Sequence, residues 1–347
     1  MHAFEWSQVA VRRRNVRIDP ERVVYVISDL HLGDGTFSDT FAAKDKYLLD
    51  FLKKVDSEDA TLVVAGDAVD FSQAWFFTKI LRAHGKVLGA FSAMAAKDRL
   101  FYVLGNHDHD LQFYTDMLRI PVVHGVEIGQ KTLILHGYEF DPVIGVDIDG
   151  SEWRTKMHHL VERLLKTWIR LPIQHFYTRW NRLSFWVFHK AIFFQRLRAE
   201  LTDKLLGGDR LSAVEAQIRY WMLGQVGDPG GIWKQARHAV ETGPYELVVS
   251  GHSHLPGIVN LPGGRRYANT GSWTFRSATV LRIEGDQVGL RDWISGREWA
   301  DELYQPLLRG DFDNLSFDDW WEQNYMGWLR YRVAEPTPES AQSRKAK

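Results

Sequence analysis

The chain contains no cysteine among its 347 residues. Disulfide bonds, thiolate catalysis and cysteine-bound zinc are therefore excluded, and any metal must be held by His, Asp, Glu, Asn or backbone oxygen. A long apolar run is also missing, since the most apolar region, residues 185–194, is interrupted by His189 and Lys190. We therefore expect no membrane-spanning helix.

Charge of one sign is not in excess either, because the net charge is -1. The whole chain thus has no general attraction to nucleic acid or membrane, and any such attraction must come from a local patch. The first fifteen residues lack the apolar core and small-residue cleavage site of a secretory signal. We expect a cytoplasmic protein, with peripheral contact to a membrane surface left open.

Short runs of β-branched and aromatic residues alternate with helical patterns. Strands are predicted at residues 22–28, 61–65, 100–104, 132–135, 247–250, 267–273, 278–283 and 288–293. Helices are predicted at residues 41–55 and 74–96. Short apolar runs separated by helices indicate a parallel or mixed sheet that is buried on both faces, and the closely spaced last three strands favour antiparallel pairing.

The pattern predicts one α/β core formed by residues 22–150 and 242–300. Residues 151–241 have no convincing strand and are predicted to form a helical insertion, or cap. Residues 301–334 are an aromatic segment expected to pack on the core or on a partner. The polar tail, residues 335–347, is predicted to be disordered.

Polar side chains follow five of the predicted strands, at the point where each strand ends. In chain order they are Asp29 and His31, then Asp67, then Asn106, His107 and Asp108, then His136, and finally His252 and His254. Ligands of α/β sheets bind at the carboxyl ends of the strands, where loops bring distant residues together. Each motif alone is more often a loop, a turn or a structural histidine. Together they point to a metal, because burying so many Asp and His side chains without one costs several kcal/mol.

The spacing within two of these motifs is two residues. In an extended chain, residues i and i+2 point to the same side. Asp29 and His31 are therefore expected to face one metal while Leu30 faces the core.

The series D-x-H, G-D, G-N-H-D, H-G and G-H-S-H resembles the five signature motifs of the calcineurin-like metallophosphoesterase superfamily. The resemblance implies a four-layer α/β/β/α sandwich with two divalent metal ions in its active site. It would assign one ion to Asp29, His31, Asp67 and His254, and the other to Asp67, Asn106, His136 and His252. Members of the superfamily use Mn, Fe, Zn or Mg, and four histidines favour Mn as the first expectation.

A two-metal site suits the hydrolysis of phosphate esters by an activated water. The resemblance and the chemistry together make His107 the expected proton donor to the leaving oxygen, or a charge stabiliser, with Asp108 orienting its ring. The alternative is a histidine that only supports the site. Other residues are expected to be turn or capping residues or partners of the ligands (Asp34, Asp70 and Asp141), or loop, interface or surface residues (His109, His158, His159, His175 and His189).

The first half of the insertion is basic and aromatic. Residues 153–198 contain ten lysines and arginines but only one acidic residue, Glu162. This composition fits a cap that grips an anionic phosphate-containing substrate, either a small molecule or a lipid-linked one. It also fits contact with an anionic membrane surface or, less well given the net charge, with nucleic acid. The simplest alternative is a helical core with a solvated basic face.

Within the superfamily, the chain most resembles the UDP-2,3-diacylglucosamine pyrophosphatases, which share the I-S-D-L-H-L opening, the G-H-x-H close and a helical insertion. It departs from them at His107, where they carry Arg, and after Gly137, where they carry Asp. A nuclease of the same superfamily is the second hypothesis. A scaffold without activity is the third, and it ranks last because all seven expected ligand positions are filled.

Overall fold

The computed structural model describes residues 15–36, 38–41, 44–141, 157, 160–161, 163–164, 179–225, 229–274, 277–311 and 315–322. The chain divides into two compact units, Met1–Thr167 with Leu223–Arg309, and Trp168–Met222 with Gly310–Lys347. Each unit is described by itself. The boundaries of core, cap, aromatic segment and tail expected from the sequence stay predictions, and the polar tail lies outside the described residues.

The first unit contains a seven-stranded sheet that carries three of the predicted motifs. Its order is β13 (Glu298–Trp299), β12 (Gln287–Asp292), β11 (Thr279–Glu284), β2 (Val24–Ile27), β3 (Thr61–Ala65), β4 (Leu100–Val103) and β5 (Val122–Val123). Strands β2 to β5 are parallel, whereas β11 to β13 are antiparallel. The carboxyl ends of β2, β3 and β4 therefore lie side by side.

A second sheet of six strands carries the other two motifs. Its order is β1 (Asn15–Ile18), β6 (Gly125–Ile128), β7 (Thr132–Ile134), β8 (Leu247–Ser250), β10 (Arg266–Asn269) and β9 (Gly257–Asn260). Strands β7 and β8 are parallel neighbours, so their carboxyl ends also lie side by side.

The alternation of buried residues explains how the two sheets stack. In β2, Val24 and Val26 belong to an apolar cluster that also includes Val126 and Val249 of the second sheet. Tyr25 and Ile27 point the other way, into a second cluster with the helices α2 and α4. Because both faces of the strand are buried, the sheet is covered on both sides.

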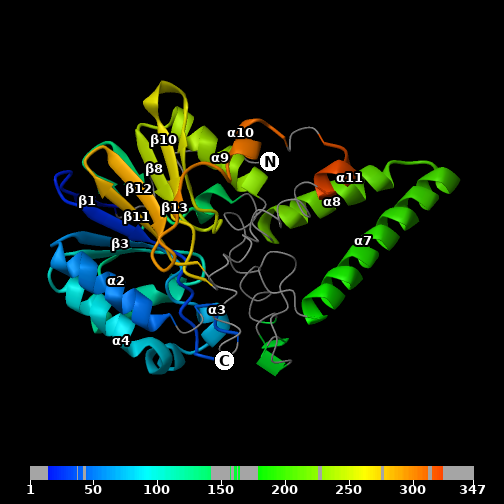
Figure 1. Ribbon diagram of the computed structural model, residues 1–347. Coiled ribbons are helices and arrows are strands. Elements are labelled where there is room, and N and C mark those ends of the chain that lie inside the picture. The colour runs from blue at the N-terminus through cyan, green and yellow to red at the C-terminus, as the bar shows by residue number, and fades with distance from the viewer. Residues whose placement is uncertain are drawn as a thin grey trace. The chain divides into compact units, whose positions relative to one another are not determined.

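Helices complete the outer layers (Figure 1). The helices α2 (Asp45–Ser57) and α4 (Phe77–Ala95) cover the seven-stranded sheet, and Phe51 of α2 packs on Trp273 and Trp293. The helix α9 (Pro229–Thr242) lies on the six-stranded sheet, where the Trp233 ring packs on Tyr267. The predicted α/β/β/α sandwich is confirmed.

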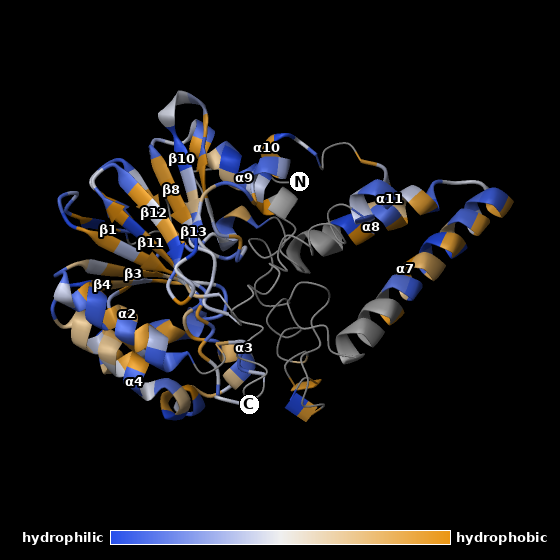
Figure 2. Cartoon of the chain, viewed as in Figure 1, coloured by the Kyte–Doolittle hydropathy of each residue, from blue (hydrophilic) through white to orange (hydrophobic). Residues whose placement is uncertain are grey.

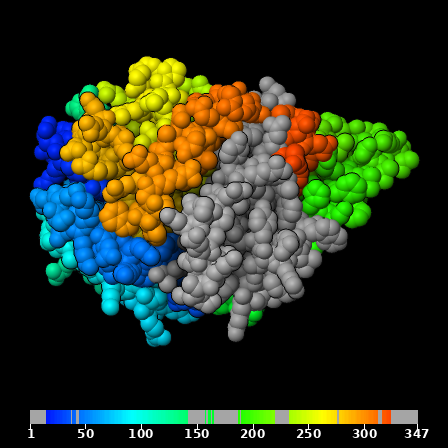
Figure 3. Space-filling model, in the orientation of Figure 1, coloured from blue at the N-terminus to red at the C-terminus, as the bar shows by residue number. Residues whose placement is uncertain are grey.

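The hydropathy pattern follows these layers. Figure 2 shows orange, hydrophobic residues along the strands, and helices that alternate between orange and blue around their axes. Figure 3 is coloured by position along the chain instead. On the face it shows, the blue atoms around α2 lie against the orange atoms of the last strands, so segments far apart in the sequence are neighbours there.

The remaining elements of the first unit are short. They are α3 (Phe71–Ala74), η1 (His109–Tyr114), α5 (Thr115–Leu118), η2 (Tyr138–Phe140), η3 (Pro262–Gly264) and α10 (Gln305–Leu308). Three of them, α3, η1 and η2, follow ligand motifs and so lie beside the site.

Helices dominate the described part of the second unit. They are α7 (Arg179–Leu206), α8 (Arg210–Gln225), which continues into the first unit, and α11 (Phe317–Trp320). Arg196 of α7 joins all three, because its guanidinium lies 2.6 Å from Glu215 and 2.6 Å from Asp318. Among the described residues, no helix is both long and apolar enough to cross a membrane.

All eight predicted strands are confirmed, two with the same bounds and the others with ends that shift by up to four residues. The strands β1, β5, β6, β9 and β13 were not predicted, and each has four residues or fewer. Strands this short leave little periodicity to detect, and tertiary pairing decides their formation. The helix predicted at 74–96 also needs correction, because Trp75 has a left-handed backbone that separates α3 from α4.

His84 should make the stability of this unit depend on pH. The ring lies inside α4, 2.9 Å from Asp39 through Nε2 and 2.9 Å from Asp45 through Nδ1. Burial opposes protonation, but the two carboxylates raise the pKa of His84 to about 9. The ion pairs therefore stabilise the fold fully below the unfolded pKa of about 6.5, and this contribution is lost as pH rises through 9.

We expect the free energy of unfolding to fall by about 3 kcal/mol between pH 6 and 10 from this residue alone. Urea unfolding of the wild type and His84→Gln across this range isolates the effect, because the other titrating groups are common to both proteins. Equal pH slopes in the two proteins would contradict the prediction.

Candidate metal centre

The five predicted motifs meet at one edge of the two sheets. Asp29 follows β2, Asp67 follows β3, Asn106 follows β4, His136 follows β7, and His252 follows β8. Parallel pairing of β2, β3 and β4, and of β7 and β8, sends their carboxyl ends in the same direction. The fold thus gathers residues that lie far apart in the sequence.

Five of the predicted ligands have a left-handed backbone, with φ between 50° and 63°: Asp29, His31, Asp67, His252 and His254. The extended chain expected around Leu30 is therefore wrong, although Leu30 itself is fully buried as predicted. Backbone hydrogen bonds hold the loop in place, from Asp29 N to Gly66 O at 3.0 Å and from His31 N to Asp67 O at 2.9 Å. Positive φ is uncommon outside glycine, and such strain clusters at functional sites.

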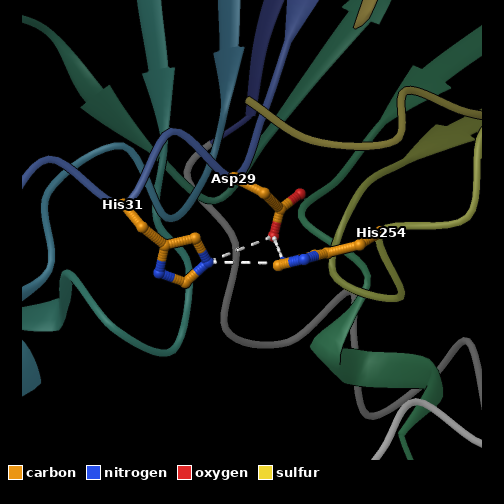
Figure 4. A group of neighbouring side chains, drawn as sticks. All are labelled: Asp29, His31 and His254. Carbon is orange, nitrogen blue, oxygen red and sulfur yellow. Dashed lines mark hydrogen bonds and ion pairs between the residues drawn. The ribbon is translucent and has the colours of Figure 1, made fainter. Parts of the chain in front are cut away.

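One group of side chains consists of Asp29, His31 and His254 (Figure 4). Nε2 of His31 lies 3.3 Å from Nε2 of His254. Asp29 Oδ1 lies 3.1 Å from the His254 nitrogen and 3.9 Å from the His31 nitrogen. Three potential ligand atoms from the first and last motifs therefore converge on one point.

A second group consists of Asp67, His136 and His252, whose ligand atoms lie within 4.8 Å of one another. Nε2 of His136 lies 3.2 Å from Asp67 Oδ2 and 3.2 Å from Asn106 Oδ1. All seven residues predicted as ligands are thus found in or beside one of the two groups.

Asp67 lies between the groups. Its Oδ2 atom is 3.2 Å from His136 Nε2 and 3.9 Å from His31 Nε2, which belong to different groups. Its other oxygen accepts a hydrogen bond from the His107 backbone N–H at 2.8 Å. One carboxylate oxygen is therefore close to the ligand atoms of both groups.

Neighbouring groups hold the outer ring nitrogens of the histidines. His31 Nδ1 lies 3.1 Å from Asp70 Oδ2, and His136 Nδ1 lies 2.8 Å from the Ala65 carbonyl. His252 Nε2 lies 3.0 Å from Asp141 Oδ2. Such partners fix the ring and leave the opposite nitrogen for a metal. Two of the acids that the sequence left undecided, Asp70 and Asp141, therefore contact predicted ligands.

The partner predicted for His107 is wrong. Asp108 accepts hydrogen bonds from Gly105 N, Ala68 N and the Tyr102 hydroxyl, at 2.7, 3.0 and 2.5 Å. These hydrogen bonds engage Asp108 with the loop after β4 and its neighbours, so Asp108 does not orient the His107 ring. His107 Nδ1 instead lies 3.3 Å from Asp70 Oδ1.

Two glycines make room for the ligands. A Cβ atom at position 105 would collide with the Asp67 carboxylate, and one at position 251 would collide with Ser28 and Asp29. Any side chain at either position would displace a carboxylate from the site. This accounts for the glycines in the third and fifth motifs.

The remaining histidines lie elsewhere or outside the described residues. His189 contacts Trp321 in the second unit, and His109 begins η1. Positions 158, 159 and 175 are not among the described residues.

The electrostatics of the cluster favour a bound cation. Burial works to raise the pKa of Asp67, but the surrounding imidazoles, His136 first, hold it below its usual range. Burial likewise opposes protonation of His136, yet Asp67 raises its pKa to about 10. Protons and metal ions compete for the same nitrogens, and the buried carboxylates attract both.

The residues also fit a metal chemically. Asp29 Oδ1 is buried, and Nε2 of His254 and Nε2 of His31 lie 3.1 and 3.9 Å from it. A buried carboxylate needs a cationic partner, and one coordinated cation would serve the oxygen and both nitrogens together. Imidazole nitrogens with carboxylate and amide oxygens are the donors of borderline divalent metals. The geometry therefore defines a buried candidate metal site at strand ends.

The family follows from the sequence match. Residues 22–256 match the calcineurin-like phosphoesterases. This is more than half of the chain, so the chain belongs to that family. It is accordingly a hydrolase that cleaves phosphoesters with the help of bound metal.

Several solved structures show weak likeness. A predicted phosphoesterase from Streptococcus pneumoniae TIGR4 is 13% identical with a TM-score of 0.31, covering 80% of this chain and 92% of that chain. A dimetal phosphatase from Danio rerio is 13% identical with a TM-score of 0.34, covering 79% and 96%. A cold-active protein-tyrosine phosphatase from a psychrophilic Shewanella species is 14% identical with a TM-score of 0.35, covering 82% and 81%. Such scores carry no argument about function, and no curated protein matches the chain.

Proposed function

We propose that the protein uses two divalent metal ions to hydrolyse a phosphate ester or pyrophosphate bond. The observation that carries the proposal is the convergence of three ligand atoms, since Nε2 of His254 and Nε2 of His31 lie 3.1 and 3.9 Å from the buried Asp29 Oδ1 atom. A cation among these three atoms is the simplest way to satisfy them.

The proposed ligand sets are those expected from the sequence. One ion would bind Asp29, His31, Asp67 and His254, and the other would bind Asp67, Asn106, His136 and His252. The position of Asp67 Oδ2 near both groups supports its role as the shared ligand. Because Asp141 engages Nε2 of His252, Nδ1 is left for the metal. Mn is the proposed metal, since four imidazoles favour a borderline ion over Mg.

When bound, the ions would supply the Lewis acidity that activates water and offsets phosphate charge. The chain's own contribution is to hold the ligands, through Asp70 and the Ala65 carbonyl, and to provide a proton. His107 is the proposed donor to the leaving oxygen. Its side chain is 21% exposed, so it can reach a substrate, and Asp70 engages Nδ1, which leaves Nε2 to donate.

The protonation state of His107 suits this role. Burial works to lower its pKa, but the Asp70 and Asp67 carboxylates raise the pKa to about 9. The ring therefore carries a proton at neutral pH in the metal-free protein. A protonated imidazole can act as a general acid or as a fixed positive charge beside the phosphate.

The proposed substrate is a nucleotide-sugar or lipid-linked phosphate or pyrophosphate. The basic and aromatic composition of residues 153–198 supports an anionic substrate with an apolar part. Exposed apolar side chains on α7, among them Phe194, Leu201 and Leu205, support contact with an amphiphile or a membrane surface. A nuclease remains the second hypothesis and an inactive scaffold the third.

The test combines metal removal with a substrate panel. Chelator-treated protein should hydrolyse nothing, and added Mn²⁺ should restore cleavage of p-nitrophenyl phosphate or bis-p-nitrophenyl phosphate. Fastest cleavage of a UDP-linked diacylated sugar would support the proposed substrate, whereas preference for single-stranded DNA would favour the nuclease. Failure of the metal-loaded protein to cleave any of them would overturn the proposal.

A further inference from the structure

Arg163, a residue of the first unit, contacts the loop after β2 and the helix α3, both beside the metal centre. Its Nη2 atom donates a hydrogen bond to the backbone carbonyl of Gln73 at 2.8 Å and lies 2.9 Å from Asp34 Oδ2. The Asp34 side chain is only 3% exposed, against 27% for Arg163. The arginine therefore neutralises a buried carboxylate in the loop after β2, three residues after the proposed ligand His31.

Asp34 and Gln73 also hold each other. The side-chain Nε2 atom of Gln73 donates to Asp34 Oδ1 at 2.7 Å, and the side-chain Oε1 atom of Gln73 accepts from the Asp34 backbone N–H at 2.7 Å. A Cβ atom at Gly33 would collide with the Gln73 amide. Because this contact has no spare room, a shift of the loop must move α3 as well.

Gln73 is also linked, through Asp70, to His107, the proposed proton donor. The Gln73 backbone N–H donates to Asp70 Oδ1 at 2.9 Å, at the start of α3. Asp70 Oδ1 lies 3.3 Å from His107 Nδ1, and Asp70 Oδ2 lies 3.1 Å from His31 Nδ1. An unbroken series of hydrogen bonds thus runs from Arg163 through Gln73 and Asp70 to both rings.

Removal of the arginine would leave Asp34 buried without its cation. A buried carboxylate that loses its partner is strongly destabilised and must either gain water or move. Its remaining hydrogen bonds go to Thr36 and Gln73. Movement of Asp34 would therefore shift Gln73, which is hydrogen-bonded to it, and would in turn shift Asp70.

We propose that Arg163 is a positioning residue that, through Gln73 and Asp70, sets the orientation of the His107 ring. This proposal rests on the proposed function of His107. The ring is aligned with the leaving oxygen only while Arg163 holds Asp34 and Gln73.

The experiment compares Arg163→Met with Arg163→Lys and with a matched control, Arg196→Met. Arg196 also comes from the insertion and is 23% exposed, but its ion pairs lie in the second unit. For bis-p-nitrophenyl phosphate at saturating Mn²⁺, kcat of Arg163→Met should fall about tenfold, because outer partners of a site are worth about ten- to a hundredfold. KM should stay nearly constant, Arg163→Lys should recover part of kcat, and Arg196→Met should behave as wild type.

A second readout does not depend on turnover. The imidazole nitrogen NMR signals of His31 and His107 in the full-length, metal-free chain should shift in Arg163→Met and stay unchanged in Arg196→Met. A lower Tm with unchanged kcat and unchanged His107 signals would show a structural contact only and overturn the proposal. If the wild type hydrolyses no phosphoester, the proposed function fails, and the His107 signals still decide whether Arg163 positions the ring.

Discussion

Replacement of Asp67 by asparagine should abolish turnover and lower the bound metal at both sites. Asp67 Oδ2 lies near nitrogens of both side-chain groups, at 3.2 Å from His136 and 3.9 Å from His31. An amide keeps the shape of the side chain but removes the charge that both ions would share. Loss of both Lewis acids should reduce kcat by about a thousandfold or more.

Metal analysis after dialysis against Mn²⁺, combined with a p-nitrophenyl phosphate assay, checks this result. Asp29→Asn is the informative comparison, because Asp29 belongs to one group only and should lower metal content less. Asp116→Asn, an exposed residue of α5, serves as the neutral control. Wild-type turnover in the Asp67 variant would rule out the shared-ligand arrangement.

Replacement of His107 by asparagine should slow hydrolysis by about a hundredfold without loss of metal, since general acids contribute about a hundred- to ten-thousandfold. The His107 ring packs edge-on against the ring of His31 and its backbone N–H donates to Asp67, but its Nδ1 atom contacts Asp70, which is not a proposed ligand. Turnover should therefore fall while metal content stays at the wild-type level.

The leaving group separates the two roles considered for this histidine. A proton donor matters most when the leaving oxygen is basic, so the loss should be larger for phenyl phosphate than for p-nitrophenyl phosphate. An equal loss with both would indicate a fixed positive charge instead. Asp70→Asn should show a smaller loss of the same kind, and an unchanged kcat in His107→Asn would exclude both roles.

The outcome at Asp108 shows where reasoning from motifs ends. The family resemblance and the chemistry suggested that Asp108 orients His107, yet Asp108 caps the turn after β4 and binds the Tyr102 hydroxyl. Asp70, which comes from another loop, takes the orienting position. Neighbours in a tight turn point in different directions, so side-chain partners depend on which loops the sheet brings together.

The backbone of the motifs is a second example. The two-residue spacing of Asp29 and His31 predicted an extended chain, whereas both residues are left-handed. Leu30 enters the core all the same, since its side chain is fully buried. The residues of the site could thus be predicted, but their local conformation could not.

By itself, the sequence predicted an α/β core with a buried sheet and seven candidate ligands at strand ends. Those inferences rest on local properties, namely runs of apolar residues long enough to show their period and the chemistry of the side chains that follow them, whereas the four layers and the two ligand sets came from the family resemblance. Only the tertiary structure decided the short strands such as β5 and β13, the position of Asp67 between the two groups, the pairing of Asp70 with His107, and the contact of Arg163 with Asp34. Each of these depends on residues far apart in the sequence that become neighbours when the sheets form, and no local pattern encodes such distances.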